Sequence, residues 1–153
     1  MRHLIISLIV PLTIISFWSI GKWWYALPED APDTIYTGFP LIYSGPGWHT
    51  SFSYQIFITE LIIDLLFYFA FWFLIVFLIK RFKQEFKVTK IITFGLWVAT
   101  FVLAINQTFL LIVSDNVYHL KRPYPIQVLE TGIEFGWKIP QRPDYDKYFP
   151  KDR

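Results

Sequence analysis

Hydrophobic positions of the chain gather into three long runs, and polar residues fill the segments between them. Each run is long enough to cross a hydrocarbon core of about 30 Å, because a helix rises about 1.5 Å per residue. The predicted transmembrane helices cover about residues 4–25, 55–80 and 90–113. Around them lie an outer loop at 26–54, a link at 80–90 and a tail at 114–153. The sequence therefore predicts a single integral membrane domain over residues 1–153.

Residues near the first run allow two interpretations. Pro11 is expected to kink a membrane helix, which neighbouring helices can accommodate. Lys22 and the aromatic residues at 23–25 are typical of the interface between membrane and water. The alternative is a cleaved signal peptide, because Ser19 and Gly21 are small residues at a suitable spacing for cleavage. The length of the run favours the retained helix.

Basic residues predict how the helices cross the membrane. The 80–90 link carries five Lys or Arg residues against one acid, Glu85, whereas the 26–54 loop carries three acids and no Lys or Arg. Basic residues prefer the cytoplasmic side. We therefore expect a protein of the cell (inner) membrane. Its N-terminus and the link should lie on the cytoplasmic side, and the loop and the tail on the extracytoplasmic side. The short link makes the second and third helices antiparallel neighbours.

The two outer segments predict only a small cap on the helices. Pro and Gly residues punctuate the outer loop and leave two short β-prone pieces, at 35–37 and 41–43. In the tail, apolar and polar residues alternate over 133–139, which is typical of a half-buried strand. Residues 126–129 are its expected partner, joined by a turn at 130–132. The expected fold class is an all-α membrane protein with three transmembrane helices and a small extracytoplasmic loop and β-hairpin cap.

Four polar residues inside the second and third runs are expected to meet within the membrane. Glu60 and Asp64 are four residues apart and therefore share one helix face. Asn106 and Gln107 lie near the outer end of the third run, at matching depth. Insertion of an acidic side chain at such depth in the membrane costs about 2.5–3.5 kcal/mol of free energy, so the carboxyl group should face protein or water rather than lipid. We predict one intramembrane polar cluster of these four residues.

This cluster has three interpretations. Its carboxyl and amide groups could join helices or bind the helix of a partner subunit. They could instead form a proton or cation relay, which would require an oligomer or a larger complex, because three helices can hardly enclose a pathway alone. Glu60 could also be simply interfacial if the second helix starts later. Two carboxylates this close should not both be ionised without compensation, so one holds its proton, or a cation or donor lies between them.

A second candidate site lies just outside the membrane. His49 precedes the second helix and His119 follows the third, with Lys121 and Arg122 close behind. The histidines and a carboxylate could make a metal site, but no tight histidine pair supports it, and the basic residues ordinarily meet lipid headgroups. We predict no metal, no catalytic residue and no cofactor, because the sequence motifs of hydrolases, nucleotide-binding loops and dinucleotide folds are absent.

Composition narrows the function classes. Hydrophobic residues make up 54% of the chain and charged residues 17%. The chain has no cysteine, which excludes disulfides and thiolate metal sites, and its net charge of +2 is too weak to suggest nucleic acid. The expected partners are the lipid bilayer and other membrane protein subunits or further copies of this chain. We expect a non-enzymatic accessory or assembly subunit of a larger membrane complex. The alternatives are an oligomeric proton or cation conductor that uses Glu60 and Asp64, and a membrane-embedded enzyme for a lipid-linked substrate.

Overall fold

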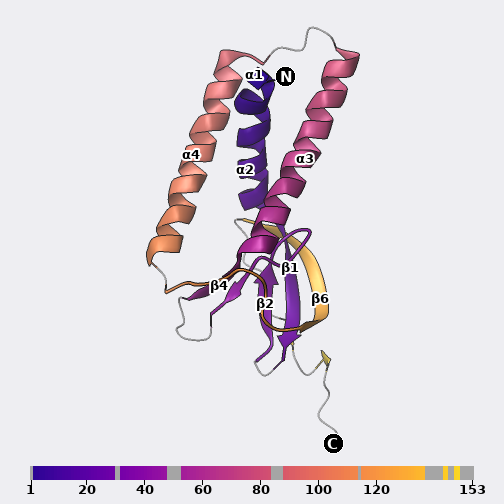
Figure 1. Cartoon of the computed structure of the whole chain (residues 1–153), viewed down its shortest axis with the longest axis vertical. Coiled ribbons are helices and arrows are strands. Elements are labelled where there is room, and N and C mark those ends of the chain that lie inside the picture. The colour runs from indigo at the N-terminus through magenta and orange to yellow at the C-terminus, as the bar shows by residue number, and fades with distance from the viewer. Residues whose placement is uncertain are drawn as a thin grey trace, which may run out of the picture. The chain divides into compact units, whose positions relative to one another are not determined.

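Helices and a β-sheet together make up this protein, as its computed structural model shows (Figure 1). The structure describes residues 2–29, 32–47, 53–83, 88–113, 115–136, 143–144 and 147–148. The chain is 52% helical and 26% strand, so the predicted all-α class is wrong. It divides into two compact units within which contacts concentrate. The helix unit comprises Met1–Ser19 and Leu65–Val113, and the sheet unit comprises Ile20–Asp64 and Ser114–Arg153.

Three helices are long and apolar enough to cross a membrane, judged by length and composition. The helical segments are α1 (Arg2–Leu4), the π-helical η1 (Ile5–Ile9), α2 (Val10–Ser19), α3 (Ile58–Phe82) and α4 (Lys90–Val113). The first three segments are consecutive and form one candidate span, Arg2–Ser19. Membrane association is therefore supported. The first span is shorter than predicted: it ends at Ser19, and residues 20–25, which were expected to continue the helix, form part of a strand.

The first span contains a π-helical segment just before Pro11. The backbone N–H of Val10 donates to the carbonyl of Ile5, five residues earlier. Proline has no backbone N–H, so Pro11 cannot donate to the carbonyl of Ser7 as an α-helix would require. A widened turn is one way in which a helix accommodates such an interruption. We attribute η1 to Pro11, at which the sequence predicts a kink.

Within the helix unit, the first span contacts both other helices. The indole N–H of Trp72 on α3 donates to the Ser16 hydroxyl at 2.9 Å. The indole N–H of Trp97 on α4 donates to the Ile6 carbonyl at 3.2 Å. Such bonds are favoured in lipid because water is absent there as a competing partner. Thus α3 and α4 both pack on the first span, whereas the sequence predicts them as each other's neighbours.

The sheet unit contains six strands in the order β5-β4-β3-β2-β1-β6. The strands are β1 (Ile20–Pro28), β2 (Thr34–Thr37), β3 (Ser44–Pro46), β4 (Tyr54–Phe57), β5 (Val117–His119) and β6 (Ile126–Phe135). Neighbouring strands are antiparallel except β4 and β5, which run parallel. The first four strands precede α3 and the last two follow α4. Both outer segments of the chain therefore fold into one sheet.

The predicted β-hairpin in the tail is wrong for the residues that the structure describes, and residues 137–139 of its expected second strand lie outside them. Residues 126–135 form one continuous strand, β6, which pairs along its whole length with β1. The expected turn at 130–132 is extended and pairs with residues 23–25 of β1, where Gly132 lies against the ring of Trp23. A Cβ atom at this position would come within 2.5 Å of Trp23 Nε1. Glycine here makes room for a cross-strand indole rather than for a turn.

The core of the sheet unit is aromatic. Ala26, Tyr36, Ile42 and Phe57 are buried together, and these residues come from three strands and from the segment between β2 and β3. Of the two β-prone pieces predicted in the outer loop, residues 35–37 lie in β2, but residues 41–43 lie between strands. Burial of four side chains from separate segments ties the sheet together through the hydrophobic effect.

Candidate functional site

The candidate site surrounds the first two turns of α3, which belong to the sheet unit. Strand β4 leads directly into α3, and β5 pairs with β4 in parallel register, with Phe57 opposite His119. The chain after β5 then continues beside the start of the helix. The Leu120 carbonyl accepts the backbone N–H of Thr59 at 3.0 Å and its hydroxyl at 2.6 Å. This contact satisfies one of the backbone donors that a helix leaves free at its N-terminal end.

Glu60 occupies the first turn of α3 and is half-buried. Its Oε1 accepts the backbone N–H of Arg122 at 3.5 Å. A negative charge is favourable at this end of a helix, because the helix dipole is positive there. Oε2 of Glu60 is buried and has no hydrogen-bond partner within the described residues.

Asp64 lies one turn further along α3 and is fully buried, with 0% of its surface exposed. The backbone N–H of Leu41 donates to its Oδ1 at 2.9 Å. The segment from Gly38 to Leu41 is folded so that this N–H is presented to the helix, and Gly38 has a φ of 151°. Oδ2 of Asp64, like Oε2 of Glu60, is buried without a partner in the part of the chain that the structure describes.

A chain of hydrogen bonds runs through the core of the same unit. The hydroxyl of Tyr36 donates to that of Tyr124 at 3.4 Å, and Tyr124 donates to Oε1 of Gln55 at 2.8 Å. The side-chain amide of Gln55 donates in turn to the Pro46 carbonyl at 3.2 Å. Burial raises the pKa of both tyrosines, while the positive charge of Arg122 opposes the rise. Both hydroxyls therefore stay neutral donors and hold the core rather than exchange protons.

The predicted intramembrane cluster is divided between the two units. Glu60 and Asp64 belong to the sheet unit, whereas Asn106 and Gln107 lie on α4 in the helix unit. Asn106 is exposed and Gln107 is half-buried. The described partners of the two carboxylates are backbone N–H groups: that of Leu41 donates to Asp64, and that of Arg122 donates to Glu60. The association of the carboxylates with the two amides stays a prediction.

The second predicted site is described only in part. His49 lies outside the described residues. The His119 ring packs beside Phe57 with centroids 6.1 Å apart, and the guanidinium Nε of Arg122 donates to the Tyr124 carbonyl at 3.1 Å. Lys121 is exposed. Among the described residues, no group of three or more His, Asp or Glu side chains is placed to hold a metal ion.

Sequence reasoning missed the groups that meet the carboxylates. Leu41 and Arg122 contact the site through backbone N–H groups, which carry no sequence signature of their own. Leu41 lies 23 residues from Asp64, and Arg122 lies 62 residues from Glu60. The Gly38-Phe39-Pro40 stretch was the available signal, because it predicts a turn, but it does not say which helix the turn contacts.

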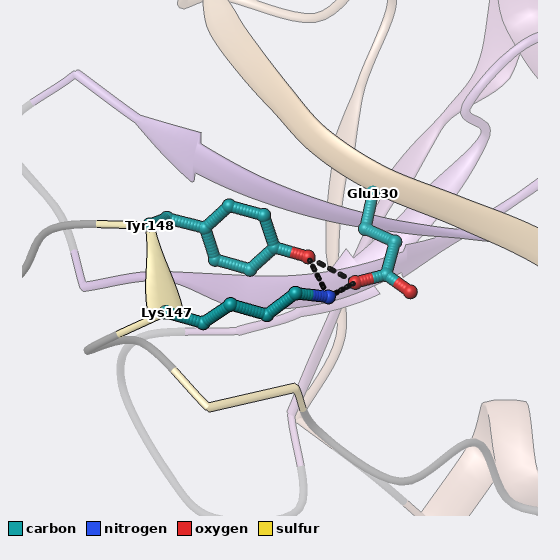
Figure 2. A network of polar contacts seen from close by, with 3 residues as sticks. All are labelled: Glu130, Lys147 and Tyr148. Carbon is teal, nitrogen blue, oxygen red and sulfur yellow. Dashed lines mark hydrogen bonds and ion pairs between the residues drawn. The ribbon is translucent and has the colours of Figure 1, made fainter.

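A separate polar network joins residues 147–148 to β6 (Figure 2). Lys147 forms an ion pair with Oε2 of Glu130 at 3.3 Å, and the Tyr148 hydroxyl donates to the same oxygen. The Tyr148 ring also lies 5.8 Å from the ring of the buried Tyr25 on β1. The hydrogen bond from Tyr148, and then that from Lys147, lowers the pKa of Glu130. The hydrogen bonds of Lys147 to Tyr148, and then to Glu130, raise the pKa of Lys147. These contacts hold residues 147–148 against the sheet.

The lowered pKa of Glu130 gives this network a defined pH dependence. The carboxylate form makes the contacts, so they are fully present above the ordinary pKa of Glu and are lost as the pH falls through the lowered value. We expect the NMR signals of the Tyr148 ring to shift in a single acid transition below the ordinary carboxyl range. Glu130→Gln should abolish this transition, whereas Glu29→Gln should preserve it. An unchanged transition in Glu130→Gln would contradict the assignment.

A comparison of the chain with protein-family models, with curated protein sequences and with solved structures finds no match.

Proposed function

We propose that this protein is a non-enzymatic subunit of a larger membrane complex, bound to its partner through α4. The observation that carries the proposal is the exposed face of α4 that contains Ile92, Gly95, Ala99, Val102 and Asn106. These residues repeat at intervals of three and four, which places them along one side of a helix. A Cβ atom on Gly95 would meet nothing within 4 Å, so this side of α4 is open.

The chemistry of this face suits another helix better than lipid. Gly95 and Ala99 are small and allow two helix backbones to approach closely. Asn106 lies within the candidate span Lys90–Thr108, about 24 Å along the helix from Lys90. A carboxamide exposed at that depth needs a hydrogen-bond partner that hydrocarbon cannot supply. A helix of a partner subunit, or α4 of a second copy, supplies both the close packing and the polar partner.

The other sides of α4 have different character. Trp97 and Thr100 face the first span, to which each donates a hydrogen bond. Phe94, Phe101 and Ile105 are exposed and large, and they lie on a third side that suits lipid chains. The face of α4 that contains Gly95, Ala99 and Asn106 is therefore distinct both from the side that contacts the first span and from the lipid-facing side.

The sheet supports the proposed orientation in a cell (inner) membrane. Strands from before α3 and from after α4 pair within one sheet, which supports a placement of both outer segments on the same side of the membrane. The basic 80–90 link favours the cytoplasmic side for the opposite ends of these helices. In this proposal the N-terminus is cytoplasmic and the sheet unit and the C-terminus are extracytoplasmic.

Site-specific photo-crosslinking in native membranes tests the proposed interface. A photoreactive residue at Val102 should give adducts with another membrane protein or with a second copy, identified by mass spectrometry. Phe101 is the matched control, because it is equally exposed at 63% and adjacent in depth but lies on the lipid-facing side. Asn106→Leu should reduce the Val102 adduct about threefold, since such bonds contribute about 0.6 kcal/mol on average. Equal yields at both positions, or no protein adduct at Val102, would refute the proposal.

A further inference from the structure

Two buried acceptor atoms near the start of α3 lack a donor. Oε2 of Glu60 and Oδ2 of Asp64 have no hydrogen-bond partner within the described residues. The other oxygen of each carboxyl group is engaged, by the Arg122 N–H at 3.5 Å and the Leu41 N–H at 2.9 Å respectively. Buried polar atoms are nearly always paired in native proteins, with protein groups or with ordered water, so two unpaired acceptors on successive turns of one helix call for a hydrogen-bond donor or a cation.

The spacing of Glu60 and Asp64 along α3 would allow their side chains to share a single hydrogen bond. Residues four apart on a helix have Cβ atoms about 5–6 Å apart, a separation that the Glu and Asp side chains can bridge. Both residues lie in the part of α3 that belongs to the sheet unit. One hydrogen atom on either unpaired oxygen, donated to the other, would satisfy both acceptors at once.

The surrounding residues favour a proton over a metal ion. A hard cation such as Ca²⁺ takes six to eight oxygen ligands, whereas the described residues place no group of three acidic or histidine side chains together. A proton needs only the two unpaired oxygens.

Neighbouring charged and titratable groups do not neutralise the pair. The Gly38–Leu41 turn has none, whereas the segment 117–124 and β2 carry six: Tyr118, His119, Lys121, Arg122, Tyr124 and Tyr36. His119 packs beside Phe57, and Lys121 is exposed. The Arg122 guanidinium donates to the Tyr124 carbonyl. No Lys or Arg side chain among the described residues forms an ion pair with Glu60 or Asp64.

We propose that Glu60 and Asp64 form a proton-binding site that holds one proton in the folded protein. Asp64 carries the proton on Oδ2 and donates it to Oε2 of the Glu60 carboxylate. The neutral form suits Asp64 because it is fully buried, and the Leu41 N–H still has the carbonyl oxygen of the neutral acid as an acceptor. The negative charge suits Glu60, which is half-buried and closer to the positive end of the helix dipole.

Infrared spectroscopy of the full chain in lipid nanodiscs at neutral pH tests this assignment directly. A protonated carboxyl group gives a C=O stretching band that carboxylates lack. We expect one such band from the buried pair, shifted when aspartate carries ¹³C in its side-chain carboxyl and unshifted when glutamate carries the label. Because labelling changes no residue, this test does not depend on a variant that folds. Absence of the band, or a shift only with labelled glutamate, would overturn the proposal.

Substitutions provide an independent test with matched controls. Asp64→Asn should abolish the band and keep the fold, because the amide can accept the Leu41 N–H and donate to Glu60. Glu60→Gln should keep the band but change its frequency, because an amide oxygen is a weaker acceptor than a carboxylate. Asp33→Asn, at the acid that accepts the Tyr25 hydroxyl, should leave the band unchanged. A band that persists in Asp64→Asn would refute the proposal.

Discussion

Replacement of Gly38 by alanine should lower the free energy of unfolding of the sheet unit by about 3 kcal/mol or more. Gly38 has a φ of 151°, a conformation that residues with a side chain rarely adopt. A Cβ atom there would also come within 1.9 Å of the Leu41 carbonyl oxygen, which is backbone and cannot rotate away. The turn would have to open, and the hydrogen bond from the Leu41 N–H to Asp64 would be lost.

Denaturant unfolding in detergent micelles, followed by tryptophan fluorescence, can measure this loss. Trp24 is a suitable reporter because its indole N–H donates to the Gly38 carbonyl at 2.8 Å. Gly21→Ala provides the control, since a Cβ atom on Gly21 meets nothing within 4 Å, and it should change the stability by less than about 0.5 kcal/mol. Similar stabilities for the two variants would show that the 38–41 turn does not require glycine.

Phe57→Ala should destabilise the sheet unit by about 3–5 kcal/mol, as is usual when a buried aromatic side chain is removed. Phe57 is fully buried at the end of β4 and packs in the core with Tyr36 and Ile42. Its ring also lies 6.2 Å from that of Tyr124, in an edge-on arrangement. The cavity left by alanine would remove the contacts that join β4, β2 and the segment after β5.

The control for this substitution lies on the same strand. Tyr54 begins β4 and is 46% exposed, so Tyr54→Ala should cost less than about 1 kcal/mol. Hydrogen exchange of the β4 and β5 amides can follow both variants, with faster exchange expected only in Phe57→Ala. Equal protection in the two variants would mean that Phe57 is not part of the core that stabilises these strands.

The sequence predicted part of the candidate site but not its surroundings. Glu60 and Asp64 could be recognised because two acids four residues apart interrupt an otherwise apolar run. Their partners could not be recognised, because the N–H groups of Leu41 and Arg122 are common to almost all residues. Only folding brings these groups to α3 from 23 and 62 residues away.

By itself, the sequence determined the three membrane-length helices, because a run of about 20 apolar residues has few other stable solutions. It also singled out the two acids of α3, which lie in one unit and each keep one buried oxygen without a partner among the described residues. The tertiary structure decided that residues 20–28 form a strand, and that residues 126–135 pair with it rather than fold into a hairpin. Alternation along a strand indicates which side chains are buried, but it does not identify the partner strand. That choice depended on packing between distant segments, such as Trp23 on Gly132.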